Sequence, residues 1–245
     1  AQIGVFGEMA KKGYIYKGLK TVYWCPHCET ALAEAEIEYK DDKSFSIYVK
    51  FKSVDLNCHM PKGADPEKVF ALIWTTTPWT IPCNVAISAN EEFDYVWVRV
   101  GDEYLLMAKD LVEPTMKAGK VEDYEVLPDV MKGKQLEGLV FQHPLYADRK
   151  VPVILGDHVT LEAGTGLVHT APDHGEDDFN VCMKYAAWGL KPLGTVDGTG
   201  RYTDKVPGFE GQFVFDSNVP VIKKLAEINA LFAKSTFRHQ YPHCW

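Results

Sequence analysis

Two stretches of the sequence gather side chains that could do chemistry, and the first is a run of three threonines. Thr75, Thr76 and Thr77 follow directly on the apolar run 70–74. Pro78 restricts the residue before it to extended backbone, so we expect the hydroxyls on alternate sides of the chain. Such a cluster can hold a ribose, a carbonyl or a water molecule. The plainer alternative is a threonine-rich strand end whose hydroxyls face solvent.

The second stretch, GTGLVHTAPDHGEDD, contains two histidines and four acids between His169 and Asp178. A carboxylate in a cleft can anchor an ammonium group, and a nearby imidazole can shape a pocket or orient water. His169, His174 and Asp178 could instead bind zinc in a metal-dependent hydrolase, although the spacings H-x-x-x-H and H-E-x-x-H are absent. A solvated helix start capped by acids is the third interpretation. GTG alone is no phosphate-binding fingerprint.

The cysteines suggest a metal site of another kind. Cys25 and Cys28 form a C-x-x-C turn, which can point two thiolates at one tetrahedral ion. Cys244 lies in YPHCW at the end of the chain. We predict a structural zinc site of these three cysteines with a fourth ligand beyond Trp245, which implies a segment of a longer protein. The neighbouring histidines as ligands, free thiols and a redox pair are the alternatives; a redox pair lacks its βαβ context.

The elements that must position these side chains are mostly strands. Runs rich in Val, Ile, Tyr, Phe and Trp occur at 46–51, 70–74, 84–88, 95–100 and 103–108, and further strands are expected at 136–144, 150–156 and 164–172. This spacing favours an antiparallel sheet or barrel over βαβ units. Helices are expected at 1–13, at 108–118 with an interruption at Pro114, at 176–190 and at 217–233.

The predicted fold class is therefore α+β: a β-barrel-like body with peripheral helices and flanking extended arms. We place an N-terminal arm with the cysteine turn at 1–45, the β-rich body at 46–216, and a C-terminal helix with half of a second cysteine turn at 217–245. Hydrophobic residues make up 46% and charged residues 24% of the chain, which excludes disorder as the main state. A net charge of −8 argues against a cationic nucleic-acid binder, but not against a local basic path. No apolar run is long enough for a membrane helix.

Four segments together resemble the editing insertion of isoleucyl-tRNA synthetases: WTTTPWTIPCNVAIS, GTGLVHTAPDHGEDDF, KTVYWCPHCETALAEAEIEY and YPHCW. The resemblance runs from Gly13 to Trp245. The sister valyl and leucyl enzymes typically carry Thr-Thr-Arg-Pro, whereas position 77 is Thr here, so the isoleucyl family is favoured. The HIGH-like and KMSKS-like motifs of the activation domain are absent, and no aminoacyl-adenylate synthesis is expected.

This resemblance implies an ester hydrolase. A synthetase cannot reject a side chain that lacks one methylene by more than about 1–3 kcal/mol, and isoleucine against valine is the standard example of that limit. The implied substrate is valine esterified to the 3′-terminal adenosine of isoleucine tRNA, with valyl-adenylate as a second candidate. The implied partners are that tRNA and the catalytic domain of the parent synthetase. We expect a cytoplasmic monomer that needs no cofactor for hydrolysis.

The resemblance also implies roles for individual residues. Asp178 would grip the substrate's α-ammonium, and His169 would close the side-chain pocket against isoleucine. The hydroxyls of Thr75, Thr76 and Thr77 would hold the ester, the ribose and the attacking water, with Asn84 supporting the cleft and Trp74 walling it. Position 173 is Asp where the family commonly has Gly, so its role is open. The rival from another class is a tRNA- or protein-binding module without chemistry.

Overall fold

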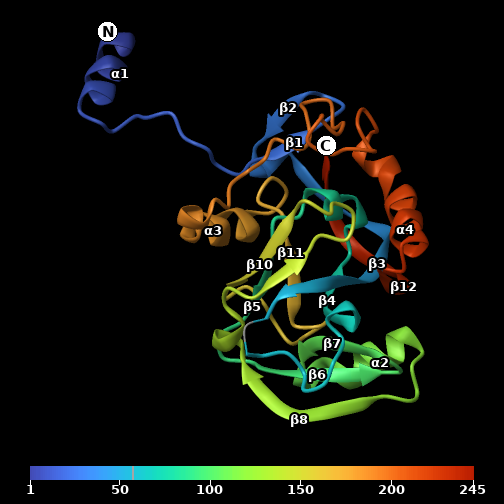
Figure 1. The fold of residues 1–245 in the computed structure, drawn as a ribbon. Coiled ribbons are helices and arrows are strands. Elements are labelled where there is room, and N and C mark those ends of the chain that lie inside the picture. The colour runs from blue at the N-terminus through green and yellow to red at the C-terminus, as the bar shows by residue number, and fades with distance from the viewer. Residues whose placement is uncertain (57) are drawn as a thin grey trace.

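Six strands close into a barrel. The computed structural model describes residues 1–56 and 58–245, without the side chains of residues 43 and 237–239. Around the barrel the hydrogen-bonded order is β3-β9-β10-β5-β11-β4, and β4 pairs back onto β3 to close the ring (Figure 1). These six strands are β3 (Ile37–Asp55), β4 (Val69–Thr75), β5 (Ala86–Ala89), β9 (Val140–Gln142), β10 (Lys150–Leu155) and β11 (Leu167–Thr170).

Further elements extend the barrel or cover it. A second sheet segment of β7 (Glu103–Ala108), β6 (Asp94–Val100) and β8 (Glu125–Lys132) continues outward from β4, and β12 (Leu231–Cys244) lies on the other edge, against β3. The helices are α1 (Gln2–Lys11), α2 (Val112–Gly119), α3 (Glu176–Lys184) and α4 (Asn218–Glu227). The predicted α+β barrel with peripheral helices is confirmed.

The strand pairing is less regular than a meander. Hairpin neighbours such as β6 and β7 are antiparallel, but β10–β5, β11–β4 and β4–β7 are parallel pairs. Parallel neighbours need a crossover rather than a tight turn. Here the connections run through other strands, and α2 lies within two of them, those that join β5 to β10 and β4 to β11. Spacing along the sequence alone did not reveal them.

Successive side chains along each strand point to opposite faces, and apolar residues pack on both. Val49, Phe51, Ala71 and Ile73 are fully buried in the main core, inside the barrel. Leu72, on the opposite face of β4, packs outside the barrel in a second core with the residues of α2. A third core lies between α3 and the strands β5 and β10. A period of two is what places successive side chains on opposite sides of a strand.

The last predicted helix, 217–233, is wrong in its second half. α4 ends at Glu227, and Asn229 adopts a left-handed backbone with φ of +57°. Asn tolerates that conformation and ends helices with it. The chain then becomes β12, which pairs with β3 from Leu231↔Val49 to Cys244↔Ile37. The resulting two-stranded ribbon crosses the predicted boundary between residues 45 and 46.

The other predicted helices differ in smaller ways. Pro114 does not interrupt α2, because it lies in the first turn, where no helical N–H is lost. The helix predicted at 176–190 ends at Lys184 and is followed by the 3-10 turn Ala186–Trp188. α1 stands away from the barrel and buries none of its residues (Figure 1). Within the described residues no helix is long and apolar enough to cross a membrane.

Candidate functional site

The two stretches singled out in the sequence meet at one end of the barrel. β4 and β11 are parallel neighbours, with Val168 opposite Trp74. The carboxyl ends of parallel strands lie at the same edge of a sheet. The threonine run that ends β4 therefore lies beside the loop that follows β11. A 3-10 helix, η3 (Pro78–Cys83), continues from the threonines and brings Asn84 back to the same place.

His169 is held from both sides of its ring. It is only 6% exposed, and its Nε2 lies 2.7 Å from Thr80 Oγ1 while its Nδ1 lies 3.1 Å from Asn84 Nδ2. The Asn84 amide nitrogen also donates to the Ala86 carbonyl at 2.8 Å, which fixes its identity as a donor. Nδ1 of His169 is therefore the acceptor, and the ring carries its proton on Nε2.

A series of hydrogen bonds links His169 to the threonine run. His169 Nε2–H donates to Thr80 Oγ1, and that hydroxyl donates to the Thr77 carbonyl at 2.8 Å. Burial, with a smaller contribution from the nearby His174, lowers the pKa of His169 to about 3. The ring is neutral at physiological pH. It has no free lone pair, because Nδ1 accepts from Asn84.

Asp178 lies beside the carboxyl end of β11, in the first turn of α3. Its Oδ2 accepts a hydrogen bond from the backbone N–H of Ala171, the residue that follows β11, at 2.9 Å. Burial raises the pKa of Asp178 to about 6, and repulsion from Asp177 adds to the rise. A carboxylate with few compensating hydrogen bonds is suited to receive a cation.

The three predicted threonines are arranged differently from one another. Thr75 is buried inside the barrel end, and its Oγ1 accepts a bond from the N–H of Thr77 at 3.0 Å. The Thr76 carbonyl accepts from the Ser44 hydroxyl at 2.7 Å. Thr77 supplies its carbonyl to Thr80. The backbone of the run is thus fixed by hydrogen bonds.

The Trp74 side chain does not lie with those of Thr75 and His169. It precedes Thr75 on β4, and adjacent strand residues face opposite sides. The indole N–H donates to Ser46 Oγ at 2.7 Å, and the ring packs against the backbone of Gly164. The structure therefore places Trp74 on the outside of the barrel wall, while Thr75 and His169 face inward.

The structure gives Asp173 a clear partner. Its carboxylate accepts hydrogen bonds from the N–H groups of Leu193 and Thr195 and, at 2.7 Å, from the Thr195 hydroxyl. His174 Nε2 lies 3.0 Å from the same hydroxyl, and its ring meets Trp79 edge-on at 4.8 Å. Burial lowers the pKa of His174 to about 4. Asp173 thus anchors the loop 193–195 beside the site.

Residues 1–225 match the family "tRNA synthetases class I (I, L, M and V)". The chain belongs to the class I tRNA synthetase family.

Two relatives within this family of class I synthetases are isoleucine–tRNA ligases. That of Thermoanaerobacter sp. (strain X514) is 55% identical over 245 residues, and that of Desulforamulus reducens is 53% identical over 244 residues. Each match covers 100% of this chain but 26% or 25% of the relative. The chain spans about a quarter of the length of the curated relatives it matches. The resemblance inferred from the four sequence segments is confirmed.

Solved structures of class I synthetase domains share the fold. The crystal structure of GlLeuRS-CP1 matches with a TM-score of 0.61 at 16% identity, covering 78% of this chain and 98% of that chain. The editing domain of the P. falciparum cytosolic leucyl-tRNA synthetase matches with a TM-score of 0.58 at 10% identity, covering 78% and 99%. This chain therefore has the fold of a CP1 editing domain.

The predicted cysteine ligands also come together in this class I synthetase chain. Cys25, Cys28 and Cys244 place one sulfur each within 4.8 Å of the others. The hairpin of β1 (Tyr23–Cys25) and β2 (Thr30–Leu32) presents the first two, and the β3–β12 ribbon returns the third. The N–H of Cys28 points at Cys25 Sγ at 3.4 Å. Three thiols at this spacing fit a tetrahedral zinc ion.

The cysteine site is separate from the barrel end. Among the described residues, this cysteine set is the one group of three or more His, Cys, Asp or Glu side chains close enough to share an ion. His169, His174 and Asp178 do not form such a group. The geometry gives no support to the metal-dependent hydrolase considered from the sequence.

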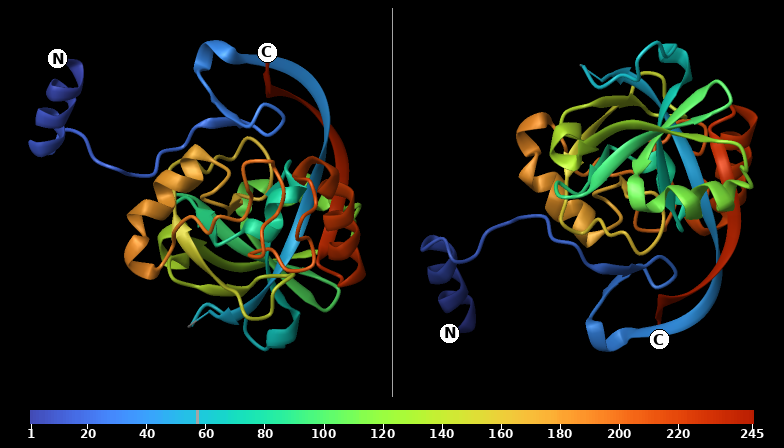
Figure 2. Two further views of the ribbon diagram at one scale, coloured as in Figure 1. Left: turned by 90° about the horizontal axis from the view of Figure 1, so that it is seen from above. Right: turned by 90° about the horizontal axis from the view of Figure 1, so that it is seen from below.

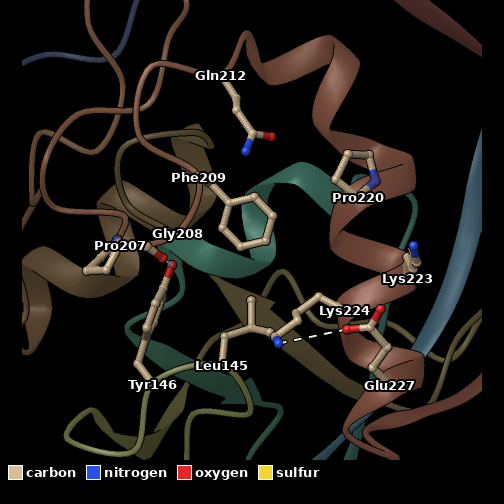
Figure 3. Close-up of a pocket in the computed structure, with 10 residues that line it drawn as sticks. All are labelled: Leu145, Tyr146, Pro207, Gly208, Phe209, Gln212, Pro220, Lys223, Lys224 and Glu227. Atoms are coloured by element: carbon tan, nitrogen blue, oxygen red, sulfur yellow. Dashed lines mark hydrogen bonds and ion pairs between the residues drawn. The ribbon is translucent and has the colours of Figure 1, made fainter.

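A cavity of about 390 Å³ lies elsewhere, between α4 and the turn that joins β9 to β10 (Figure 3). Tyr146 and Phe209 line it on one side, and Lys224, in an ion pair with Glu227, lines it on the other. None of the predicted site residues is part of its lining.

Sequence reasoning missed the groups that hold the site together. Thr80 belongs to the quoted WTTTPWT segment, but only its contact with His169, 89 residues away, gives it a role. Arg149 donates to the carbonyls of Pro82 and Asn84 at 2.7 and 3.2 Å. Nothing in the residues around Arg149 marks it for this contact.

Proposed function

We propose that this domain hydrolyses valine from mischarged isoleucine tRNA. The observation that carries the proposal is His169: a neutral ring locked inside the barrel end and hydrogen-bonded to Thr80, two residues before Ala171, whose N–H donates to Asp178. A fixed ring of this kind is a steric wall. The similarity to isoleucine–tRNA ligases and to editing-domain folds supports the same function.

The two ends of the substrate amino acid would meet different groups. The α-ammonium would pair with the Asp178 carboxylate, which gains a cation that offsets the cost of its burial. The side chain would point toward His169. Valine fits, whereas isoleucine carries one more methylene, and overpacking a rigid pocket costs about 1–3 kcal/mol.

Hydrolysis then needs an oriented water molecule rather than a strong base. Water attacks the ester carbonyl, the bond to the ribose oxygen breaks, and valine and tRNA with a free hydroxyl are released. His169 cannot take the proton, because its only lone pair accepts from Asn84. We propose that the hydroxyls of Thr76 and Thr77 and the substrate's vicinal ribose hydroxyl orient the water and stabilise the oxyanion.

The decisive experiment is deacylation of two substrates by the same preparation. Valine-charged isoleucine tRNA should be hydrolysed, and isoleucine-charged tRNA should persist. The control is Asp204→Ala, which removes an exposed acid on another loop. Activity should survive EDTA; loss with chelator would favour a metallohydrolase. Binding of tRNA without release of valine would instead support the non-catalytic module.

We also propose that Cys25, Cys28 and Cys244 hold a structural zinc ion, with a fourth ligand from outside the described residues. Zinc would tie the β1–β2 hairpin to the end of the ribbon and take no part in hydrolysis. Elemental analysis of the parent protein and of Cys25→Ser should show zinc in the first and a loss in the second. Absence of zinc from the parent protein would refute the assignment.

A further inference from the structure

The turn between β9 and β10 packs against the last turn of η3. Arg149 Nη1 donates to the Pro82 carbonyl at 2.7 Å and to the Asn84 carbonyl at 3.2 Å. His143, which is 1% exposed, lies with Nε2 2.9 Å from the Ile81 carbonyl. Three backbone carbonyls at the end of η3 and just after it are thus held by two side chains from one turn.

These two side chains are themselves held by Tyr146. The Tyr146 ring stacks on His143 at 4.8 Å with an interplanar angle of 27°, and the Arg149 guanidinium lies over the same ring at 4.6 Å. The N–H of Leu145 donates to His143 Nδ1 at 3.1 Å, so the His143 proton is on Nε2 and points at Ile81. The Tyr146 hydroxyl reaches the Pro207 carbonyl (Figure 3).

The backbone contacts add to the two hydrogen bonds that the Asn84 side chain itself makes. Its amide nitrogen is shared between Ala86 and His169, and its Oδ1, although buried, has no hydrogen-bond partner among the described residues. Pro82 also removes one N–H from this segment. The Asn84 backbone is held by its N–H bond to the Ile81 carbonyl and by Arg149, in addition to the bond from its side chain to the Ala86 carbonyl.

We propose that Arg149 is a positioning residue for the side-chain pocket. By holding the carbonyls of Pro82 and Asn84 it fixes the Asn84 amide, and through that amide it fixes the ring and tautomer of His169. This inference rests on the proposed function for its effect on specificity. A guanidinium suits the task because its planar donors reach two carbonyls while its face stacks on an aromatic ring.

The first measurement follows His169 directly and needs no activity. In the unaltered chain, the imidazole nitrogen signals of His169 should show one neutral tautomer protonated on Nε2. In Arg149→Ala they should show exchange between tautomers. In Arg149→Lys, which keeps the charge but is shorter and has no planar face to stack on Tyr146, they should show an intermediate state. Arg201→Ala is the matched control, because Arg201 donates to a single carbonyl, that of Gly211, at 2.8 Å on another loop.

The second measurement is the ratio of the deacylation rates on valine- and isoleucine-charged tRNA. A loosened wall admits isoleucine, so we expect this ratio to fall about tenfold or more in Arg149→Ala, and to stay unchanged in Arg201→Ala. A contribution to stability alone would lower the unfolding midpoint and leave the ratio as it was.

The outcomes separate the two proposals. If the unaltered chain hydrolyses neither substrate, the proposed function fails, while the His169 signals still decide the role of Arg149. Unchanged His169 signals in folded Arg149→Ala overturn the positioning role, as does an unchanged rate ratio in a chain that edits. Should Arg149→Ala fail to fold, Arg149→Lys decides by the same two readouts.

Discussion

His169 is the residue on which discrimination between two aliphatic side chains would depend. Truncation to Ala removes the ring and both of its hydrogen bonds, and leaves a void of about the size of an imidazole. We expect His169→Ala to begin hydrolysing isoleucine-charged tRNA while still clearing valine-charged tRNA, because the overpacking penalty of about 1–3 kcal/mol is lost. The two deacylation rates, measured on one preparation, test this. If both rates fall together, His169 is part of the hydrolytic machinery rather than a wall.

The protonation of Asp178 should affect the stability of the fold and the activity in opposite directions: a rise in pH lowers the first and raises the second. Its folded pKa of about 6 lies above the ordinary value of 3.8, so between these values the folded chain binds the proton more tightly than the unfolded chain. Stability must therefore fall as pH rises through about 4 to 6, by on the order of 2–3 kcal/mol. Asp178→Asn keeps an acceptor for Ala171 and removes this loss. In urea unfolding at pH 8 we expect the Asn variant to be the more stable chain.

The same carboxylate should control activity in the opposite direction. Binding of the substrate ammonium needs the ionised form, so kcat/KM for valine-charged tRNA should decline as pH falls through about 6. Asp178→Asn should be inactive at every pH. A variant that is folded, stable and still active would remove Asp178 from the site.

At the scale of elements, one buried ion pair ties the barrel to the outer sheet segment. Lys50 of β3 is 6% exposed, and its Nζ lies 2.8 and 2.9 Å from the two carboxylate oxygens of Glu103, at the start of β7. The ammonium also lies over the Phe70 ring at 5.0 Å. The pair spans β4, the strand between them.

Removing one partner of this pair should cost more than removing both. Glu103→Leu leaves a buried ammonium without its anion, so we expect a loss of about 3–5 kcal/mol in the free energy of unfolding. Lys50→Met combined with Glu103→Leu should recover most of that loss. Urea denaturation of the two single variants and the double variant gives the coupling. Additive effects would mean that the pair contributes little.

The strands were predictable from the sequence where apolar residues alternate or cluster, as in β4 and β6. β12 was not, because its polar stretch gives no such pattern and its existence depends on pairing with β3. Asn229, which ends α4, was the available signal. Within the site, His169 and Asp178 stood out by their types, whereas Thr80 and Arg149 act through partners 65 or more residues away. The residues near Thr80 and Arg149 in the sequence do not predict such contacts.

At the scale of the whole molecule, α1 contributes nothing to the packed body. None of its residues is buried, and Ile3 and Phe6 are 89% and 60% exposed. Deletion of residues 1–13 should therefore leave the thermal unfolding midpoint unchanged, within the effect of about 0.5 kcal/mol typical of surface changes. It should also reduce self-association, since exposed apolar side chains promote it. A clear drop in the midpoint would show that α1 packs on the barrel in solution.

The β3–β12 ribbon has a mechanical consequence. It leaves the barrel as two hydrogen-bonded strands and curves toward the cysteine hairpin (Figure 2). A two-stranded ribbon resists bending within its own plane, because that would stretch one strand and break its ladder, but it flexes readily across that plane. The ribbon is therefore stiff in one direction and flexible in the other. We expect the barrel to move relative to the cysteine hairpin mainly in one direction, across the plane of the ribbon.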